Sequence, residues 1–364
     1  AHTIRPGVHR APVHGVDRPI AQATRVGTVP GTAFALSLPN RGILLGLLTV
    51  EQILAAAVAA EASNQFAAVG IGDNLLEKPR VEAIALLGAL AARTSRVRLH
   101  LGCLSTLIIR DPILFAIQWA SLDVISGGRM ELAVCIGGGD DREMRPYGMS
   151  RRERVPRLLE TLEVVRRLWR EDHVAFEGRF HRFEDVSAQP KPVQSPPPVY
   201  LANAPDPDGP PERIDRMLLR ALRHSDGWHP TGLTPAQFGR LRVRLEELAR
   251  AERRDLSTFS ISCGSLVNIQ PDPQQARHEA EEYVRRYWPH AYEAASFDRL
   301  ISGPPDLVAE GILKYWDAGC RRIAVRIGAL HYEAQVPLLI DEVMPRVWDG
   351  VAARTRQSPR SAPG

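Results

Sequence analysis

Short apolar runs alternate with longer segments whose apolar residues recur at helical spacing along most of this chain. Most of the short runs are continuously apolar, which is typical of parallel strands covered on both faces. They predict strands at 33–38, 67–71, 97–101, 130–135, 198–202, 225–229, 259–267 and 322–327. The longer segments predict helices at 50–64, 82–93, 112–125, 151–170, 213–223, 235–253, 273–288, 305–318 and 335–348.

Helix-capping signals support this alternation. Thr49 with Gln52 fits a capping box. Asp111, Thr234 and Asp272 each stand before a proline, as N-cap residues often do. Eight strand–helix pairs predict the α/β class and, within it, a (β/α)8 TIM barrel with insertions. An open doubly wound sheet is the alternative, but the first strand is followed by PNRGILLGLLT, which lacks the glycine fingerprint of that fold.

The barrel pattern occupies residues 31–350 as one domain. Residues 1–30 are rich in proline and scattered arginine without a hydrophobic period, so we expect a flexible N-terminal arm. Residues 351–364 predict a flexible tail for the same reason. A polar, proline-rich stretch at about 171–197 predicts an insertion between the fourth helix and the fifth strand.

Composition excludes several classes of protein. Of the 364 residues, 44% are hydrophobic and 24% charged, which excludes a disordered or fibrous chain. No apolar run reaches the roughly 18 residues of a membrane span, and no secretory signal pattern opens the chain, so we expect no membrane partner. The four cysteines contain no C-x-x-C, which favours a reduced, cytoplasmic protein. A net charge of +4 spread over many helices argues against a nucleic-acid partner and weakly favours anionic small ligands.

The candidate site residues follow from the predicted barrel, which carries its active site at the carboxyl ends of its strands. The residues in those places are Asn40, Asp73, Asn74, the segments 103–110 and 135–141, Asn203, His229, Ser265 and Arg326. They contain no metal-binding histidine spacing and few carboxylates, so we predict no metal site. The glycine-rich turn CIGGGDD at 135–141 lets the backbone approach a flat or phosphorylated ligand. Such a site suits a cofactor that supplies the chemistry itself.

Several ordered motifs within 33–348 carry a family resemblance. They are GIGDNLLEKPRVEAIALLGALAARTSRVRLHLG, RDPILFAIQWASLDVISGGRMELAVCIGGG, YGMSRRERVPRLLETLEVVRRLW, FEGRFHRFEDV, PPPVYLA, SDGWH and SGPPDLVAEGI. The chain resembles the bacterial luciferase-like family of flavin-dependent monooxygenases and deazaflavin-dependent oxidoreductases. This resemblance implies a (β/α)8 barrel, often a homodimer, with reduced FMN or a deazaflavin lying across the strand ends.

At the catalytic positions, the resemblance implies roles for Asp73, Asn74 and Ser105. The family often has an Asp-His pair after the second strand, whereas this chain has Asp73-Asn74. Asparagine forms hydrogen bonds but cannot titrate, so a histidine-dependent acid–base step is not expected here. After the third strand the family commonly holds a non-prolyl cis peptide under the ring, and the matching bond is Leu104–Ser105.

The resemblance also implies cofactor contacts at the ends of the third, fourth and fifth strands. These contacts are Leu104, Ser105, Cys135, Gly137, Gly138, Asn203 and Ala204. Cys135 matches a cysteine near the flavin in the luciferase branch, and the two glycines match the loop near the flavin edge and phosphate. Asn203 and Ala204 stand where the family usually has Gly or Ser for phosphate, so the sequence LANAPDPDGPPER predicts a weakened phosphate site.

The expected substrate contacts are Asn40, Arg110, Trp228, His229 and Arg326. Arg110 in IIRDP matches a family position near the pocket rim, and Trp228 matches the family's GDGW motif. The segment 286–303 is rich in aromatic residues and lacks a regular period, so it predicts a lid over an apolar or ring-bearing substrate.

Three functions fit these features. The first is a monooxygenase in which reduced FMN, supplied by a flavin reductase, and O₂ oxidise a small organic substrate. The alternative is a hydride-transfer oxidoreductase using coenzyme F-420, which a basic groove with contributions from Arg110, Lys191 and Arg326 would favour. The third is a barrel that no longer uses flavin and binds or isomerises a ligand, as Asn74 and the altered segment 203–211 suggest.

Overall fold

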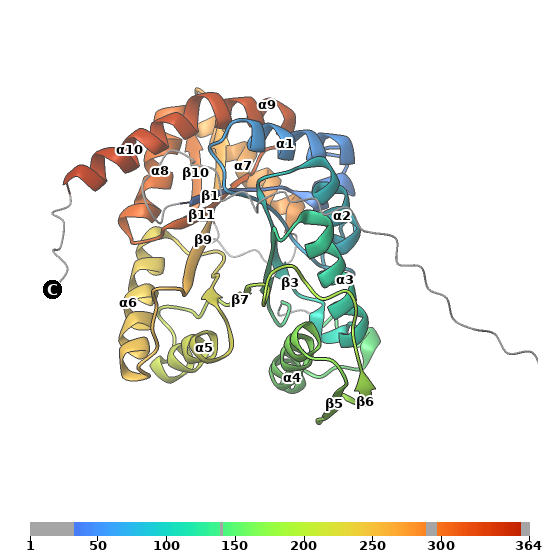
Figure 1. Ribbon diagram of the computed structural model, residues 1–364. Coiled ribbons are helices and arrows are strands. Elements are labelled where there is room, and N and C mark those ends of the chain that lie inside the picture. The colour runs from blue at the N-terminus through green and yellow to red at the C-terminus, as the bar shows by residue number, and fades with distance from the viewer. Residues whose placement is uncertain (1–32, 139–140, 289–296, 358–364) are drawn as a thin grey trace, which may run out of the picture.

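The computed structural model describes residues 33–138, 141–288 and 297–357. In these ranges, eight parallel strands close into a barrel, and helices cover its outside (Figure 1). The predicted (β/α)8 barrel is therefore confirmed. The expected arm at 1–30 lies outside the described residues, as do residues 139 and 140 of the glycine turn.

The barrel strands pair in chain order, and the last returns to the first, with Ala33 opposite Arg322 and Ser37 opposite Arg326. The third strand runs beyond its predicted end to Leu104, after a shift in register that follows Gly102. The barrel strands are β1 (Ala33–Ser37), β2 (Ala68–Ile71), β3 (Arg98–Leu104), β4 (Met130–Val134), β7 (Val199–Leu201), β8 (Gly227–Trp228), β9 (Ser260–Ile269) and β11 (Arg322–Ile327).

The helices begin where their capping residues predict. The Thr49 hydroxyl accepts from the Gln52 N–H in a capping box, and the Asp111 carboxylate accepts from the Leu114 N–H at 2.8 Å. The last helix continues past the expected boundary at 350. The helices are α1 (Val50–Ala62), α2 (Ala83–Arg93), α3 (Pro112–Ser126), α4 (Arg151–Arg170), α5 (Pro211–His224), α6 (Pro235–Ala251), α7 (Pro273–Tyr287), α8 (Pro305–Asp317), α9 (Tyr332–Pro337) and α10 (Met344–Gln357).

Two short pieces of sheet lie in the predicted insertion and in the expected lid. The insertion holds an antiparallel hairpin of β5 (Val174–Glu177) and β6 (Arg182–Val186). Part of the expected lid is a strand, β10 (Leu300–Gly303), because β9 extends beyond the barrel and offers β10 a partner. Residues 289–296 of that expected lid lie outside the described part of the chain.

An ion cluster around the buried Glu131 lies inside the barrel near the amino-terminal ends of the strands. Both carboxylate oxygens of Glu131 on β4 accept from Arg322 on β11 at 2.8 Å, and Arg98 on β3 lies 2.5 Å away. Burial opposes ionisation of Glu131, but Arg322, His100 and Arg98 hold its pKa well below the ordinary value. The cluster therefore joins three strands through one carboxylate.

We predict that Glu131→Gln lowers the free energy of unfolding by about 3–5 kcal/mol, the usual cost of removing one partner from a buried ion pair. The amide keeps the size of the side chain but leaves two guanidinium groups without a counter-charge. Urea unfolding followed by circular dichroism measures the loss. Glu310→Gln, which removes a partner of Arg354 at the surface, is the matched control and should cost at most about 1 kcal/mol. Equal losses in the two variants would contradict the prediction.

Candidate active site

A cavity of about 510 Å³ opens at the carboxyl ends of the barrel strands. Its lining includes Cys103 and Ser265 from the wider set of strand-end candidates. The predicted site residues that line it are Asp73, Asn74, Ser105, Cys135, Gly137, Gly138, Asn203, Ala204, His229 and Arg326. The rule that a barrel carries its site at the carboxyl ends of its strands therefore predicted the position of the cavity and many of its lining residues.

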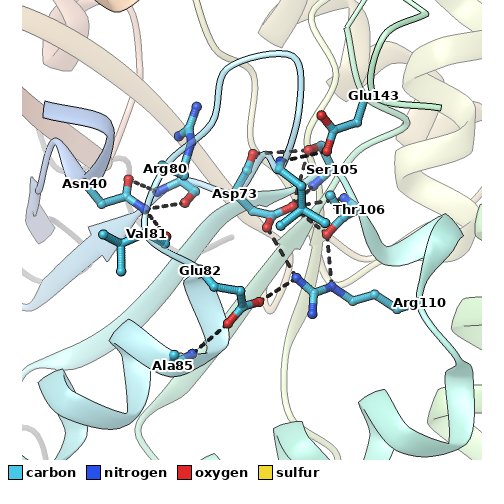
Figure 2. Close-up of polar contacts among 12 residues, drawn as sticks. Asn40, Asp73, Arg80, Val81, Glu82, Ala85, Ser105, Thr106, Arg110 and Glu143 are labelled. Carbon is cyan, nitrogen blue, oxygen red and sulfur yellow. Dashed lines mark hydrogen bonds and ion pairs between the residues drawn. The ribbon is translucent and has the colours of Figure 1, made fainter. Parts of the chain in front are cut away.

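Three predicted contacts lie outside the lining because they are core residues. Leu104 and Trp228 are fully buried, and the Trp228 ring stacks on Phe238 at 5.9 Å between centroids. Asn40 is also buried, and its amide donates to the carbonyl of Gly72 at 2.9 Å (Figure 2). Asn40 thus positions a residue of the cavity wall without facing the cavity.

Arg110 is the fourth predicted contact that the lining does not include. Its guanidinium lies behind the wall, 2.7 Å from Glu82 Oε1 and 3.5 Å from Asp73 Oδ1 (Figure 2). Its Nε donates to the Thr106 hydroxyl at 2.9 Å. Because these partners occupy the guanidinium, Arg110 braces the loop after β3 and is not placed to meet a substrate anion.

Asp73 holds this loop in place. Its Oδ2 accepts from the N–H groups of Ser105 and Thr106 at 3.1 and 3.0 Å, and from the Thr106 hydroxyl at 2.8 Å (Figure 2). The Ser105 hydroxyl in turn donates to the Asp73 carbonyl at 3.1 Å. Burial raises the pKa of Asp73, while Arg110 and the Thr106 donors oppose that rise. With its acceptors engaged, Asp73 is a positioning residue that orients Ser105.

The loop after β2 is fixed by a residue that sequence reasoning missed. The buried Glu143 carboxylate accepts from the backbone N–H groups of Leu75, Leu76 and Glu77, each at 2.8 Å. The Asn74 side-chain oxygen accepts from the Lys78 N–H and closes the same turn. The amide donor of Asn74 is what remains for a ligand, since its oxygen is engaged.

The expected cis peptide at Leu104–Ser105 is wrong. The non-prolyl cis bond of this region is Gly102–Cys103. The prediction placed the cis peptide after the end of the strand. β3 instead continues to Leu104, and the cis peptide and the shift in register both lie within its last residues.

Three glycines form a cradle in the cavity wall. A Cβ at Gly102 would lie 2.3 Å from His100 Nε2, and one at Gly138 would lie 2.9 Å from both carboxylate oxygens of Glu77. Gly137 has a φ of +79°, which disfavours any larger residue. His100 and Glu77 occupy the space that a side chain would take at Gly102 and Gly138, so the cavity wall at these places is backbone. A wall without side chains is compatible with a flat cofactor ring.

Asn203 has a structural role at the end of β7. Its Nδ2 donates to the Met217 carbonyl at 3.1 Å, and its side-chain oxygen accepts from the Trp228 indole at 3.0 Å. The side chain therefore ties α5 to β8. Contact with a phosphate through Asn203 or Ala204 stays a prediction, although both residues line the cavity.

Cationic side chains dominate the charge of the described lining, with one carboxylate, that of Asp73, against them. The cations are Lys78, Arg80, Arg220, Arg299 and Arg326. Sequence reasoning found Arg326 because it ends a strand, and missed the others because they lie farther along loops or, for Arg220, on a helix. Lys191, expected nearby, instead donates to the carbonyl of Leu168 at 2.9 Å and pairs with Asp172.

His229 is the histidine of the described lining. Its Nδ1 lies 2.6 Å from the Ser262 hydroxyl, and its ring centroid lies 4.8 Å from that of His100. Burial, followed by the nearby His100 and Arg322, lowers the pKa of His229 to about 3. The imidazole is therefore neutral at neutral pH and offers a hydrogen bond without a charge.

We predict that His229 makes the fold sensitive to mild acid. Its folded pKa lies below the unfolded value near 6.5, so the unfolded chain binds the extra proton and stability falls as the pH drops from about 6.5 toward 3. Between pH 7 and pH 5 this one group should cost about 2 kcal/mol. His229→Asn should remove that part of the pH dependence in urea unfolding. The exposed His278→Asn should leave it as in the parent, and an unchanged slope in His229→Asn would contradict the assignment.

Two absences concern the described residues alone. No three histidine, cysteine, aspartate or glutamate side chains among them gather in a way that could hold a metal ion. None of their helices is long and apolar enough to span a membrane.

Comparison with known proteins gives the family. The family model described as luciferase-like monooxygenase matches residues 32–322. The chain is 28% identical over 269 residues to a coenzyme F-420-dependent glucose-6-phosphate dehydrogenase of Kineococcus radiotolerans, covering 65% of this chain and 74% of that protein. It is 25% identical over 279 residues to the pyrimidine monooxygenase RutA of Pantoea ananatis, covering 72% and 70%.

Solved structures share the fold. Monooxygenase RslO1 from Streptomyces bottropensis superposes with a TM-score of 0.70 at 24% identity, covering 86% of this chain and 99% of that one. A coenzyme F-420-dependent secondary alcohol dehydrogenase superposes with a TM-score of 0.71 at 18% identity, covering 87% and 99%. With the barrel, the cavity at its strand ends and a family match over most of its length, the chain belongs to the luciferase-like monooxygenase family and is an oxidoreductase of that type.

Proposed function

We propose that this protein is a hydride-transfer oxidoreductase that uses coenzyme F-420. The observation that carries the proposal is the charge of the cavity, whose described lining holds five cationic side chains and one carboxylate, that of Asp73. Lys78 pairs with Glu77 at 2.7 Å, and Asp73 is engaged by Thr106 and Arg110, so the cations outnumber the anions. A basic groove is what the acidic tail of this cofactor requires.

The distribution of the cations favours a long anionic tail. Lys78 and Arg80 follow β2, Arg220 lies on α5, Arg299 precedes β10, and Arg326 lies on β11. These elements occupy different sectors of the rim, so a single phosphate can reach few of the cations. A tail with a phosphodiester and several carboxylates can satisfy more of them, and this favours F-420 over FMN.

The glycine cradle would hold the ring of the cofactor. Gly102, Gly137 and Gly138 present backbone to the cavity, and Cys135 and Ser105 lie in the same wall. When bound, the deazaflavin supplies two-electron hydride chemistry. The chain's own contribution is to orient the ring and the substrate and to exclude water.

Neutral polar groups would orient the substrate. His229 is uncharged and fixed by Ser262, and the Asn74 amide retains its donor. Trp288 also lines the cavity, and Arg326 lies 5.4 Å from its ring centroid. An aromatic wall beside a cation suits a small organic substrate that combines an apolar or ring-bearing body with a polar group.

A monooxygenase that takes reduced FMN from a flavin reductase is the second candidate. Its support is the likeness to RutA, a pyrimidine monooxygenase, over 72% of this chain. The same cradle accepts the ring of FMN, and the same cations accept its phosphate. A barrel without flavin is less well supported, since the relatives that the chain matches include an F-420-dependent dehydrogenase and a monooxygenase.

Separate titrations of the purified chain with F-420, FMN and anaerobically reduced FMN test the proposal. We expect F-420 to bind most tightly, and its absorbance to fall when a suitable donor, such as a sugar phosphate or secondary alcohol, is added. Tight binding of reduced FMN alone, with oxygen uptake in the presence of a substrate, would favour the second candidate. Binding of none of the three would contradict both.

We predict that Arg220→Met weakens F-420 binding by about 10- to 100-fold, the loss of one charge-assisted hydrogen bond. Burial and the neighbouring Arg216 lower the pKa of Arg220, so an incoming anion relieves an unfavourable environment. Fluorescence titration at two salt concentrations measures the affinity. Arg250→Met, on the exposed end of α6, removes the same charge away from the cavity and should bind as the parent does. An equal loss in both variants would indicate a general charge effect only.

A further inference from the structure

Two cysteines meet in the wall of the cavity. Cys103 lies near the end of β3 and Cys135 directly after β4, the neighbouring strand. The Cys103 thiol donates to the Cys135 sulfur across 2.8 Å. Both side chains are partly exposed, and both line the cavity. A small solute in the cavity can therefore reach either sulfur.

The other two cysteines are an internal contrast. Cys263 on β9 and Cys320 before β11 are fully buried and lie outside the cavity lining. Burial raises the pKa of both thiols, and to about 12 for Cys320. They have the character of inert core thiols, whereas the Cys103–Cys135 pair combines proximity with access.

We propose that Cys103 and Cys135 form a peroxide-sensitive dithiol site in the cavity wall. The Cys135 thiolate attacks one oxygen of hydrogen peroxide, the O–O bond breaks, and hydroxide leaves and takes up the proton to give water. Cys103 then attacks the resulting sulfenic sulfur, the S–S bond forms, and a second water leaves. Two thiols thus lose two electrons and two protons, and one peroxide is reduced to two waters.

The surroundings of the two sulfurs assign these roles. The hydrogen bond from Cys103 lowers the pKa of Cys135, and the Gly137 N–H acts in the same direction. The same contact, together with burial, raises the pKa of Cys103. The negative charge of Asp73 raises the pKa of both thiols. The positive charge of Lys78 lowers the pKa of Cys135, and that of Arg80 lowers the pKa of Cys103. Cys135 is therefore the attacking sulfur and Cys103 the resolving one.

Because the two cysteines lie in the cavity wall, a ligand bound in the cavity should change the rate at which they are oxidised. Both sulfurs lie in the wall that carries the glycine cradle, so a planar molecule held there covers them. Oxidation should be fastest in the empty protein and slower when the cavity is filled. This inference does not depend on which cofactor the protein uses.

Peroxide treatment of the reduced chain, followed by alkylation in denaturant and mass analysis, tests the site. Before treatment all four cysteines should be alkylated, and afterwards two, with the loss of two hydrogens. Trypsin releases Cys103 within residues 99–110 and Cys135 within 130–142, so a peptide joining these segments identifies the bond. Four thiols surviving the peroxide, or a bond joining Cys263 to Cys320, would overturn the proposal.

Single variants separate the two roles. In Cys103→Ser, Cys135 should stop at the sulfenic stage and be trapped by dimedone. In Cys135→Ser, Cys103 should remain reduced at the same peroxide dose, and faster oxidation of Cys103 there would overturn the assignment. Cys263→Ser is the matched control and should still form the Cys103–Cys135 bond. Circular dichroism of each variant shows that it is folded before peroxide is added.

Protection by a ligand gives an independent readout. F-420 or FMN, added before peroxide at a concentration that saturates binding, should slow formation of the cross-link. An unchanged rate with a bound ligand would place the thiols away from the ligand and overturn the predicted protection. The oxidation assay itself needs no cofactor, so its result stands apart from the failure or success of the F-420 proposal.

Discussion

Closure of the sheet between β1 and β11 is the constraint on which the rest of the structure depends. All eight barrel strands are parallel, so closure gathers their carboxyl ends on one rim. Across the seam, Arg326 donates to the Ser37 hydroxyl at 3.0 and 2.8 Å, and the closing pair thereby contributes a cation to the cavity. At the other end of the barrel, Glu131 joins β4 to β11 from inside. β11 thus contributes both to the ion cluster inside the ring and to the charge at its rim.

The sequence predicted the features that follow from hydrophobic periodicity and from the position of a residue relative to a strand end. Continuous apolar runs located the strands, and the barrel rule then brought residues such as His229 and Arg326 to one cavity. It could not predict contacts that arise from side-chain direction. Arg110 follows a strand as His229 does, yet the charges of Glu82 and Asp73 draw it behind the wall. Arg220 reaches the cavity from a helix, so a search of the residues that follow strands does not find it.

Long-range hydrogen bonds also lie beyond single-sequence reasoning. Glu143 has no motif around it, and its role appears only because the loop after β4 folds back onto the N–H groups of Leu75, Leu76 and Glu77. The proximity of Cys103 and Cys135 likewise depends on strand register, since the Cys135 N–H donates to the Leu104 carbonyl at 3.2 Å. In the sequence a helix and a strand stand between the two cysteines, so their number and spacing do not indicate that the side chains are in contact.

The polar groups of the cavity are divided by charge in a way that matches the two parts of a flavin-type cofactor. Near the strand ends, His229 is neutral because burial opposes its protonation, and the hydrogen bond to Cys135, together with burial, raises the pKa of Cys103. Arg220 on α5 and Arg326 on β11 bring cationic side chains to the same cavity. Asp73, the carboxylate of the described lining, is offset by Arg110 from behind, and Glu77 pairs with Lys78 at 2.7 Å. The described lining still holds more cationic than anionic side chains. An uncharged ring carrying an anionic tail meets matching surroundings at both ends, whereas a ligand charged at its ring would lose solvation at the strand ends without gaining a counter-charge.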